Sequence, residues 1–295
     1  MMDISTETLR ILNPYDGVYA YYDGRMDRRL YSEKPNWLDD GAYTLGTASY
    51  AIVSEGHALV YDTHMSLNHA RALRRHLESL GTHTITVVLS HWHTDHIAGN
   101  EVFADCEIIA LSVTARTMVE KRAELEGRDP PISPVIMPTR TFDRYLSLRV
   151  GARTVELHHF DIHSADGNVL WLPEEKILFA GDTLEDTVTY VSEPEHIPTH
   201  IEELKRLRAW KIEKILPNHG AEHLIASGGY EVSLIDANRV YLERLITAEG
   251  LVRAGAVSLK EFVVGELEDG SILYHPDYEV VHRQNVEAVE RVRRA

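Results

Sequence analysis

The stretch Ser-His-Trp-His-Thr-Asp-His at residues 90–96 restricts what this chain can fold into more than any other feature. Within six positions it holds four possible metal ligands: His91, His93, Asp95 and His96. The run TITVVLS, residues 84–90, directly precedes them and is short, β-branched and almost wholly apolar. Such a run is typical of a strand buried on both faces. The sequence therefore predicts a ligand-rich loop at the end of a central strand.

The side chains of this loop suit one particular chemistry. Imidazole and carboxylate groups are the usual nitrogen and oxygen ligands of zinc and its neighbours. Side chains two apart in an extended segment point the same way, so His91 and His93 could reach one ion together. Asp95 and His96 lie where the chain turns and could face a second ion. The alternative is a histidine-rich surface loop, but this spacing directly after a buried strand would then be a demanding coincidence.

Predicted strands and helices are interleaved along the rest of the chain. Residues 15–63 read as strands joined by tight turns, and a further strand is expected at 101–111. Two segments look like hairpins, at 146–160 and 168–182. Helices are expected at 66–81, 112–127, 200–215, 231–248 and over most of 258–294. This order predicts two sheets, or one wide sheet, covered by helices in one domain.

The composition argues against several classes of function. The net charge of −16 disfavours nucleic-acid and anionic-membrane surfaces, because binding to phosphate needs clustered Lys and Arg. No run approaches the roughly 18 apolar residues of a membrane span, and we see no signal peptide at the N-terminus. Cys106 is the only cysteine, so a cytoplasmic location is the default expectation. We expect a small-molecule substrate.

The stretch HWHTDH resembles the signature of the metallo-β-lactamase superfamily of hydrolases. Three further matches follow in the expected order: His163 in DIHSADGN, Asp182 nineteen positions later in AGDT, and His219 in KILPNHG. The resemblance covers about residues 40–225. It implies an α/β fold, a four-layer αββα sandwich of two mixed sheets flanked by helices. Residues 1–295 would then be a single domain, with a C-terminal helical extension at about 230–295.

The resemblance also implies a role for each ligand. One ion would be held by His91, His93 and His163. The other ion would be held by Asp95, His96 and His219, and Asp182 would bridge the two ions. Asp95 would also act in catalysis by orienting the attacking hydroxide, and Asp62 in LVYDTH would support the ligands by hydrogen bonding. The implied cofactors are two divalent ions, with zinc first and iron or manganese as alternatives.

Other histidines and an acidic run fit the pattern less well. A shift to His158 or His159 would break the spacing to Asp182, so we expect both on a strand. His64 is interpreted as a loop residue, and His223 could lie at a pocket rim. Solvated positions are expected for His57, His69, His76 and His83, and for the acidic run Glu185, Asp186, Glu193 and Glu195.

The implied reaction is hydrolysis of an ester, lactone, thioester or amide bond by a hydroxide that bridges the metals. β-Lactam hydrolysis is an alternative, since residues 163–182 look like the matching segment of true metallo-β-lactamases. Glu185 weighs against it, because some of those enzymes have a carboxylate-binding lysine there. The glyoxalase II branch shares GDTL but not its substrate-binding residues. Acyl-homoserine lactonases have a tyrosine at the position of Glu185, whereas Tyr190 lies five positions later.

An alternative from another class is an iron-dependent oxidoreductase of the same fold, similar to persulfide dioxygenases. The complete second set of ligands favours two metals, but ligands alone do not determine which metal is bound. The intact set of predicted ligands disfavours a non-catalytic binding protein. The RNA-processing nucleases of this superfamily carry a basic arm that this acidic chain lacks, which disfavours that function. The loop at 129–138, which carries four prolines, could cover the active site or serve as a rigid connector.

Overall fold

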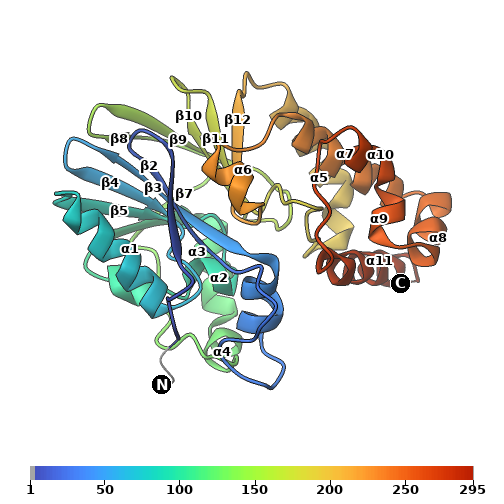
Figure 1. Ribbon diagram of the computed structural model, residues 1–295, viewed down its shortest axis with the longest axis horizontal. Coiled ribbons are helices and arrows are strands. Elements are labelled where there is room, and N and C mark those ends of the chain that lie inside the picture. The colour runs from blue at the N-terminus through green and yellow to red at the C-terminus, as the bar shows by residue number, and fades with distance from the viewer. Residues whose placement is uncertain (1–3, 295) are drawn as a thin grey trace.

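In the computed structural model, which describes residues 4–294, two β-sheets pack face to face (Figure 1). The N-terminal sheet has the order β1-β2-β3-β4-β5-β6-β7, and the C-terminal sheet has the order β12-β11-β10-β9-β8. The strands are β1 (Arg10–Tyr15), β2 (Val18–Asp23), β3 (Thr47–Ser54), β4 (His57–Tyr61), β5 (Thr84–Val88), β6 (Glu107–Leu111), β7 (Arg140–Phe142), β8 (Tyr145–Val150), β9 (Arg153–His159), β10 (Asn168–Leu172), β11 (Ile177–Gly181) and β12 (Lys214–Pro217).

Both sheets are mixed, as the resemblance implied. β1 to β4 pair in antiparallel fashion, whereas β4, β5, β6 and β7 are parallel neighbours. In the C-terminal sheet β8 to β11 are antiparallel, and β11 and β12 are parallel. The carboxyl ends of β4 and β5 therefore share one edge, and those of β9, β11 and β12 share another. Loops that leave these two edges carry the candidate ligands.

Helices cover the outer faces of both sheets. Figure 1 shows α1 and α3 against the N-terminal sheet, while α5 and α7 to α11 gather beyond the C-terminal sheet. The helices are α1 (Leu67–Ser79), α2 (Thr94–Ile97), α3 (Ser112–Glu120), α4 (Arg122–Glu126), α5 (Ile197–Arg208), α6 (Glu222–Ala226), α7 (Ser233–Leu245), α8 (Ala248–Ala256), α9 (Leu259–Phe262), α10 (Val264–Glu268) and α11 (Tyr278–Arg294), with short turns of other helix types at η1 (Leu38–Tyr43), η2 (Asn100–Phe103) and η3 (Pro194–His196). Within residues 4–294, none of these helices has the length and apolar character needed to span a membrane.

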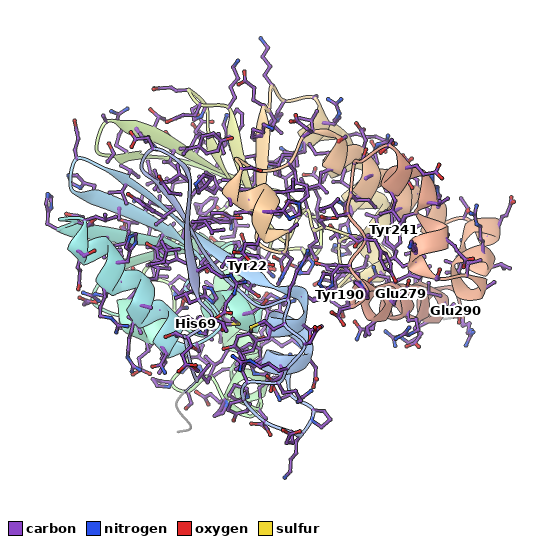
Figure 2. The ribbon with its side chains drawn as sticks, in the orientation of Figure 1. Tyr22, His69, Tyr190, Tyr241, Glu279 and Glu290 are labelled. Atoms are coloured by element: carbon purple, nitrogen blue, oxygen red, sulfur yellow. The ribbon has the colours of Figure 1, made fainter. Side chains whose placement is uncertain are left out.

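The apolar core follows the period of two that strands impose. In β4, Leu59 and Tyr61 face the core between the sheets, and Ala58 and Val60 face α1. Burying a side chain such as Leu59 contributes about 1.5–3 kcal/mol. Tyr61 also crosses between the sheets, because its hydroxyl donates to the carbonyl oxygen of Asn168 at 2.6 Å. Tyr22 lies in the core between the sheets, and Tyr241 lies among the C-terminal helices (Figure 2). The expected four-layer α/β architecture is confirmed.

Residues 15–63 are not strands throughout, because residues 24–46 between β2 and β3 form no strand and contain the turn η1. Two predicted boundaries are also wrong. The strand expected at 101–111 begins only at Glu107, after the turn η2, so Cys106 precedes the strand. The helix expected at 200–215 ends at Arg208, because residues from Lys214 onward pair with β11 as strand β12. In both segments the sequence pattern continues past the true boundary. Pairing with a neighbouring strand in the tertiary structure decides where the strand begins.

Candidate metal centre

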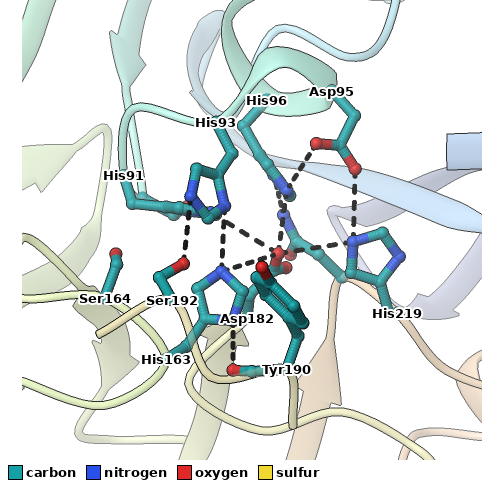
Figure 3. A network of polar contacts seen from close by, with 12 residues as sticks. His91, His93, Asp95, His96, His163, Ser164, Asp182, Tyr190, Ser192 and His219 are labelled. Carbon is teal, nitrogen blue, oxygen red and sulfur yellow. Dashed lines mark hydrogen bonds and ion pairs between the residues drawn. The ribbon is translucent and has the colours of Figure 1, made fainter. Parts of the chain in front are cut away.

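Seven side chains that the sequence singled out meet where strands of both sheets end (Figure 3). His91 and His93 follow β5, while Asp95 and His96 lie in the short helix α2. His163 comes from the loop between β9 and β10. Asp182 directly follows β11, and His219 lies just beyond β12. The packing of one sheet on the other therefore brings together residues up to 128 positions apart, from His91 to His219.

One carboxylate oxygen, Oδ2 of Asp182, lies at the centre of this cluster. Four imidazole nitrogens surround it: His96 Nε2 at 3.1 Å, His219 Nε2 at 3.3 Å, His91 Nε2 at 3.5 Å and His163 Nε2 at 3.7 Å. The dashed lines of Figure 3 converge on this atom. Asp182 thus lies among four of the five histidines of the cluster.

The cluster divides into two groups of possible ligands. The first contains His91, His93, His163 and Asp182, and the second contains Asp95, His96 and His219. In the first group, His93 Nδ1 lies 3.0 Å from His163 Nε2. In the second group, Asp95 Oδ2 lies 3.2 Å from His219 Nε2. These groups have the same membership as the two sets that the resemblance implied, while the role of each residue as a ligand stays a prediction.

The five histidines all have an outer ring nitrogen that is hydrogen bonded away from the cluster. The partners are Ser90 Oγ for His91 (2.9 Å), Ser192 Oγ for His93 (3.3 Å), Asp62 Oδ2 for His96 (3.0 Å), the Tyr190 carbonyl for His163 (2.9 Å) and the Gly46 carbonyl for His219 (2.6 Å). A carbonyl or carboxylate partner holds the proton on the outer nitrogen and leaves the inner lone pair free. This arrangement of outer partners is typical of metal-binding histidines.

Asp62 lies beside His96, while the supporting role that the resemblance implied for it stays a prediction. Its Oδ1 accepts a hydrogen bond from the Ser90 amide at 2.6 Å, and its Oδ2 accepts from the Asn218 side chain at 2.6 Å as well as facing His96. The residue is fully buried and has φ of 66°. A non-glycine residue at positive φ is uncommon. The surrounding hydrogen bonds hold this conformation.

The electrostatic environment separates the histidines into two kinds. Burial lowers the pKa of His91 well below its usual value and lowers the pKa of His93 to about 3, so both rings are neutral at pH 7. Burial also opposes charge on His96 and His219, but the carboxylate of Asp182 helps to outweigh it and raises the pKa of both rings. Burial would raise the pKa of Asp182, yet His219, His96 and His91 lower it. The ionised carboxylate is therefore the favoured form.

Two buried atoms of the cluster test whether a metal ion fits. Among the described residues, His91 Nε2 and Asp182 Oδ1 have no hydrogen-bond partner. A buried polar atom without a partner costs about 1–3 kcal/mol. A cation coordinated by these atoms would remove that cost. Five imidazoles and two carboxylates also match the ligands preferred by zinc, iron and manganese. The residues present therefore fit divalent metal.

A cavity of about 610 Å³ opens onto the cluster. Its aromatic lining includes Trp37, Trp92 and Tyr190. The C-terminal helix α11 contributes Val280, Val281 and Gln284 to the same cavity. Sequence analysis did not identify Ser192 or α11 as part of the site. No local motif marks them, because they reach it only through folding.

The prediction that the acidic run is solvated is wrong for its first two residues. Glu185 and Asp186 are buried, with 1% and 0% of their surface exposed. Glu185 accepts hydrogen bonds from the Tyr190 amide and the Tyr278 hydroxyl, both at 2.9 Å, and its Oε1 lies 3.4 Å from His163 Nδ1. Helix α11 covers this loop, which the local sequence does not reveal. Glu193 is partly buried, and only Glu195 is exposed.

Of the four histidines expected to be solvated, only His83 is exposed, while His57 and His76 are partly buried. His69 is buried rather than solvated, because α1 packs it against the sheet, where its Nε2 lies 2.9 Å from Asp23 Oδ2. His64 is a buried loop residue that stacks on His69 at 4.6 Å. His158 and His159 lie on β9 as expected, both partly buried. His223 is exposed on α6 and does not line the 610 Å³ cavity.

The proline-rich loop 129–138 borders a different cavity. Pro130 accepts a hydrogen bond from the Trp37 indole at 2.8 Å, and residues 130–134 line a cavity of about 410 Å³. Trp37 lines both cavities. Residues 129–138 are not among those that line the 610 Å³ cavity, whereas Arg128 is.

Comparison with protein families and curated proteins gives several matches. A family model described as the metallo-beta-lactamase superfamily matches residues 42–248. The chain is 28% identical over 183 residues to a beta-lactamase-like protein 2 homolog of Caenorhabditis elegans, covering 61% of this chain and 58% of that protein. It is 26% identical over 220 residues to an atrochrysone carboxyl ACP thioesterase of Aspergillus fumigatus, covering 74% and 47%. The matched region thus spans about half the length of these curated relatives.

Solved structures resemble the fold at low sequence identity. The TMB-1 structure has a TM-score of 0.62 with 18% identity and covers 81% of this chain and 99% of its own. The DIM-1 metallo-beta-lactamase has a TM-score of 0.60 with 19% identity and covers 80% and 97%. At this identity the likeness establishes the two-sheet fold and no particular substrate.

Proposed function

The chain belongs to the metallo-beta-lactamase superfamily, and from this membership we propose that it is a dinuclear metal-dependent hydrolase. The bond cleaved is an ester, lactone, thioester or amide. The observation that carries the proposal is the convergence of both ligand groups on Asp182. Its Oδ2 lies within 3.7 Å of a ring nitrogen from each of His91, His163, His96 and His219.

This geometry supports the following assignment of ligands. His91, His93 and His163 would hold one ion, and Asp95, His96 and His219 the other. Asp182 would be shared, since its carboxylate lies between the groups. Zinc is the first choice of metal, and iron or manganese would fit the same atoms. When bound, two such ions supply a water activated at neutral pH and polarise the scissile carbonyl.

Asp95 has a second role in this proposal. Its Oδ1 faces His96 at 3.5 Å and its Oδ2 faces His219 at 3.2 Å. Its side chain is 14% exposed, against 4% for Asp182, and it lines the cavity. A carboxylate at that border can accept a proton from the attacking water and orient it toward the substrate. Burial of His91 and His93 meanwhile keeps both of these rings in the neutral form that binds metal.

The cavity favours a substrate with an apolar acyl group. Trp37, Trp92, Tyr190 and the valines of α11 supply apolar surface to this cavity, beside charged residues such as Lys121 and Arg128. A β-lactamase would need a carboxylate-binding lysine at the position of Glu185. The Glu185 side chain instead accepts hydrogen bonds from the Tyr278 hydroxyl and the Tyr190 amide. Two relatives are named as ACP thioesterases. We therefore place a thioester first among the four bond types.

We also propose that residues 1–295 form one domain, with the part after about residue 230 building a wall of the active site. One apolar cluster supports this, because it joins Val169 and Leu178 of the C-terminal sheet to Tyr241 and Val289 of the helices. A separate unit would have its own core.

Metal content and a substrate panel test the proposed function together. We expect about two divalent ions per chain at the cluster and faster hydrolysis of a thioester than of a lactone, nitrocefin or a phosphodiester. Asp182→Asn should lose both metal and activity, whereas Asp105→Asn, which changes an exposed carboxylate paired with Arg74, should keep both. Wild-type metal content and activity in the Asp182 variant would contradict the proposal. Oxygen consumption with a persulfide substrate, by protein that contains one iron per chain, would also contradict it.

A further inference from the structure

A second cluster of possible ligands lies outside the candidate centre. It consists of Asp161, His196 and His200, whose ligand atoms lie within 4.8 Å of one another. His196 Nδ1 is 2.9 Å from Asp161 Oδ2, and His200 Nε2 is 3.2 Å from Asp161 Oδ1. None of the three residues lines the 610 Å³ cavity. The two clusters are therefore distinct in space, although Asp161 precedes His163 by only two positions.

The two histidines are presented by one face of a helix. His196 ends the turn η3, which runs directly into α5 at Ile197, and His196 itself has helical φ and ψ of −86° and −4°. Residues four apart on a helix lie one turn above each other. His196 and His200 can therefore offer two imidazoles to one ion. Asp161, just beyond β9, supplies an oxygen from the opposite side.

His200 is buried without the hydrogen bonds that a buried imidazole needs. Its side chain is 0% exposed, and among the described residues neither Nδ1 nor Nε2 has a hydrogen-bond partner. Asp161 Oδ1 likewise has none, since its approach to His200 Nε2 lacks the direction of a hydrogen bond. Buried polar groups in folded proteins are rarely left in this state. An ion between His200 Nε2 and Asp161 Oδ1 would satisfy these two atoms.

The chemical state and the accessibility of the cluster suit a cation. Burial lowers the pKa of His200 and so opposes protonation of the ring. The side chain of His196 is 39% exposed and that of Asp161 is 18% exposed. The cluster thus opens to solvent on one side, where water can complete the coordination of a zinc ion.

We propose that Asp161, His196 and His200 bind a third divalent ion of the zinc type, whose role is to hold α5 against the end of β9. The segment between these two elements includes Tyr190 and Ser192. The Tyr190 carbonyl accepts from His163 at 2.9 Å, and Ser192 Oγ lies 3.3 Å from His93 Nε2. A bound ion would restrain this segment and, through it, the orientation of two rings in the candidate metal centre.

Titration of chelator-treated protein with ZnCl2 tests this site. The wild-type protein should bind three zinc ions, and His196→Gln should bind one fewer or bind that ion at least tenfold more weakly. His196 is substituted first because its side chain is partly exposed, so its replacement should not unfold the protein. Asp161→Asn is a second variant. The matched control is His223→Gln, an exposed histidine on α6, which should keep all three ions. Circular dichroism verifies that each variant is folded.

The same titration in an Asp182→Asn background separates this proposal from the proposed function. Loss of one zinc ion on adding His196→Gln to that background supports the third site, whether or not the dinuclear centre exists. An unchanged number and affinity of zinc ions in both backgrounds would overturn it, and Asp161 would then be an ordinary partner of two histidines. A thermal-unfolding readout should agree: zinc should raise the Tm of the Asp182→Asn protein more than that of the double variant.

Discussion

Oδ2 of Asp62 lies 3.0 Å from Nδ1 of His96, a residue 34 positions later in the chain. Because an ionised carboxylate can only accept, this contact holds a ring proton on Nδ1, so Nε2 of His96, which lies 3.1 Å from Asp182, is the nitrogen that a metal ion would use. The contact therefore decides which nitrogen of His96 is available to a metal ion.

Asp62→Asn should weaken metal binding without unfolding the protein. An asparagine can still accept from the Ser90 amide, but its NH2 group would meet Nδ1 of His96 and the NH2 group of Asn218. The proton of His96 would then move to Nε2, and the lone pair would turn away from the cluster. Metal affinity should fall about 10–100-fold. Zinc titration measures it, Asp105→Asn is the control, and an affinity equal to wild type would refute the role given to Asp62.

Gly181→Ala should destabilise the protein and displace Asp182. Gly181 has φ of 56°, and a Cβ there would lie 3.0 Å from both Ser90 Cβ and the Tyr61 hydroxyl. The left-handed conformation alone costs an alanine about 1–2 kcal/mol. Gly265→Ala is the matched control, since nothing lies within 4 Å of its Cβ and it sits in α10. Chemical denaturation should show a loss for the first variant and none for the second. Equal effects would mean that the close approach at Gly181 is unimportant.

Tyr278→Phe should loosen α11 from the candidate centre. The Tyr278 hydroxyl donates to Glu185 Oε2 at 2.9 Å in a fully buried contact, and its removal leaves a buried carboxylate oxygen without that donor. We expect a loss of about 1–3 kcal/mol in unfolding free energy. Tyr274→Phe removes a comparable hydroxyl contact to Glu279 where solvent has access, so it should cost less. Equal losses would argue against a supporting role for Glu185.

Asp186→Asn should change how stability depends on pH. Burial raises the pKa of Asp186 to about 6, in spite of the hydrogen bond from Tyr230, whereas an unfolded aspartate has a pKa of about 3.9. The folded state therefore binds a proton at Asp186 more tightly than the unfolded state does. Protonated Asp186 contributes stability that is fully present below about pH 4 and is lost as the pH rises through 6.

The asparagine cannot ionise, and it can still accept from the Leu273 amide. The unfolding free energy of the variant relative to wild type should therefore rise between about pH 4 and 6, by on the order of 2–3 kcal/mol, and stay level above that range. Urea unfolding at several pH values in the presence of chelator measures this difference. A difference that does not vary with pH would contradict a raised pKa at Asp186.

Much of the candidate site could be predicted because its ligands follow strands in a specific order. The spacing His91, His93, Asp95, His96 is local, and the structure brings these residues together with His163, Asp182 and His219. The contacts that support them were harder to predict. Ser192 and the Tyr190 carbonyl belong to a loop with no ligand spacing, and Glu185 is buried only because α11 folds back over it.

The sequence by itself determined the strands, most helices and the identity of the groups at the candidate centre, because periodicity and motif spacing are local properties of the chain. The tertiary structure decided which atoms of those groups face one another. It turned His200 and Asp161 into a second possible ligand set, buried His69 beside Asp23, and made α11 a wall of the cavity. These results depend on how two sheets and their covering helices pack, and a contact between residues far apart in the chain leaves no periodic trace in the sequence.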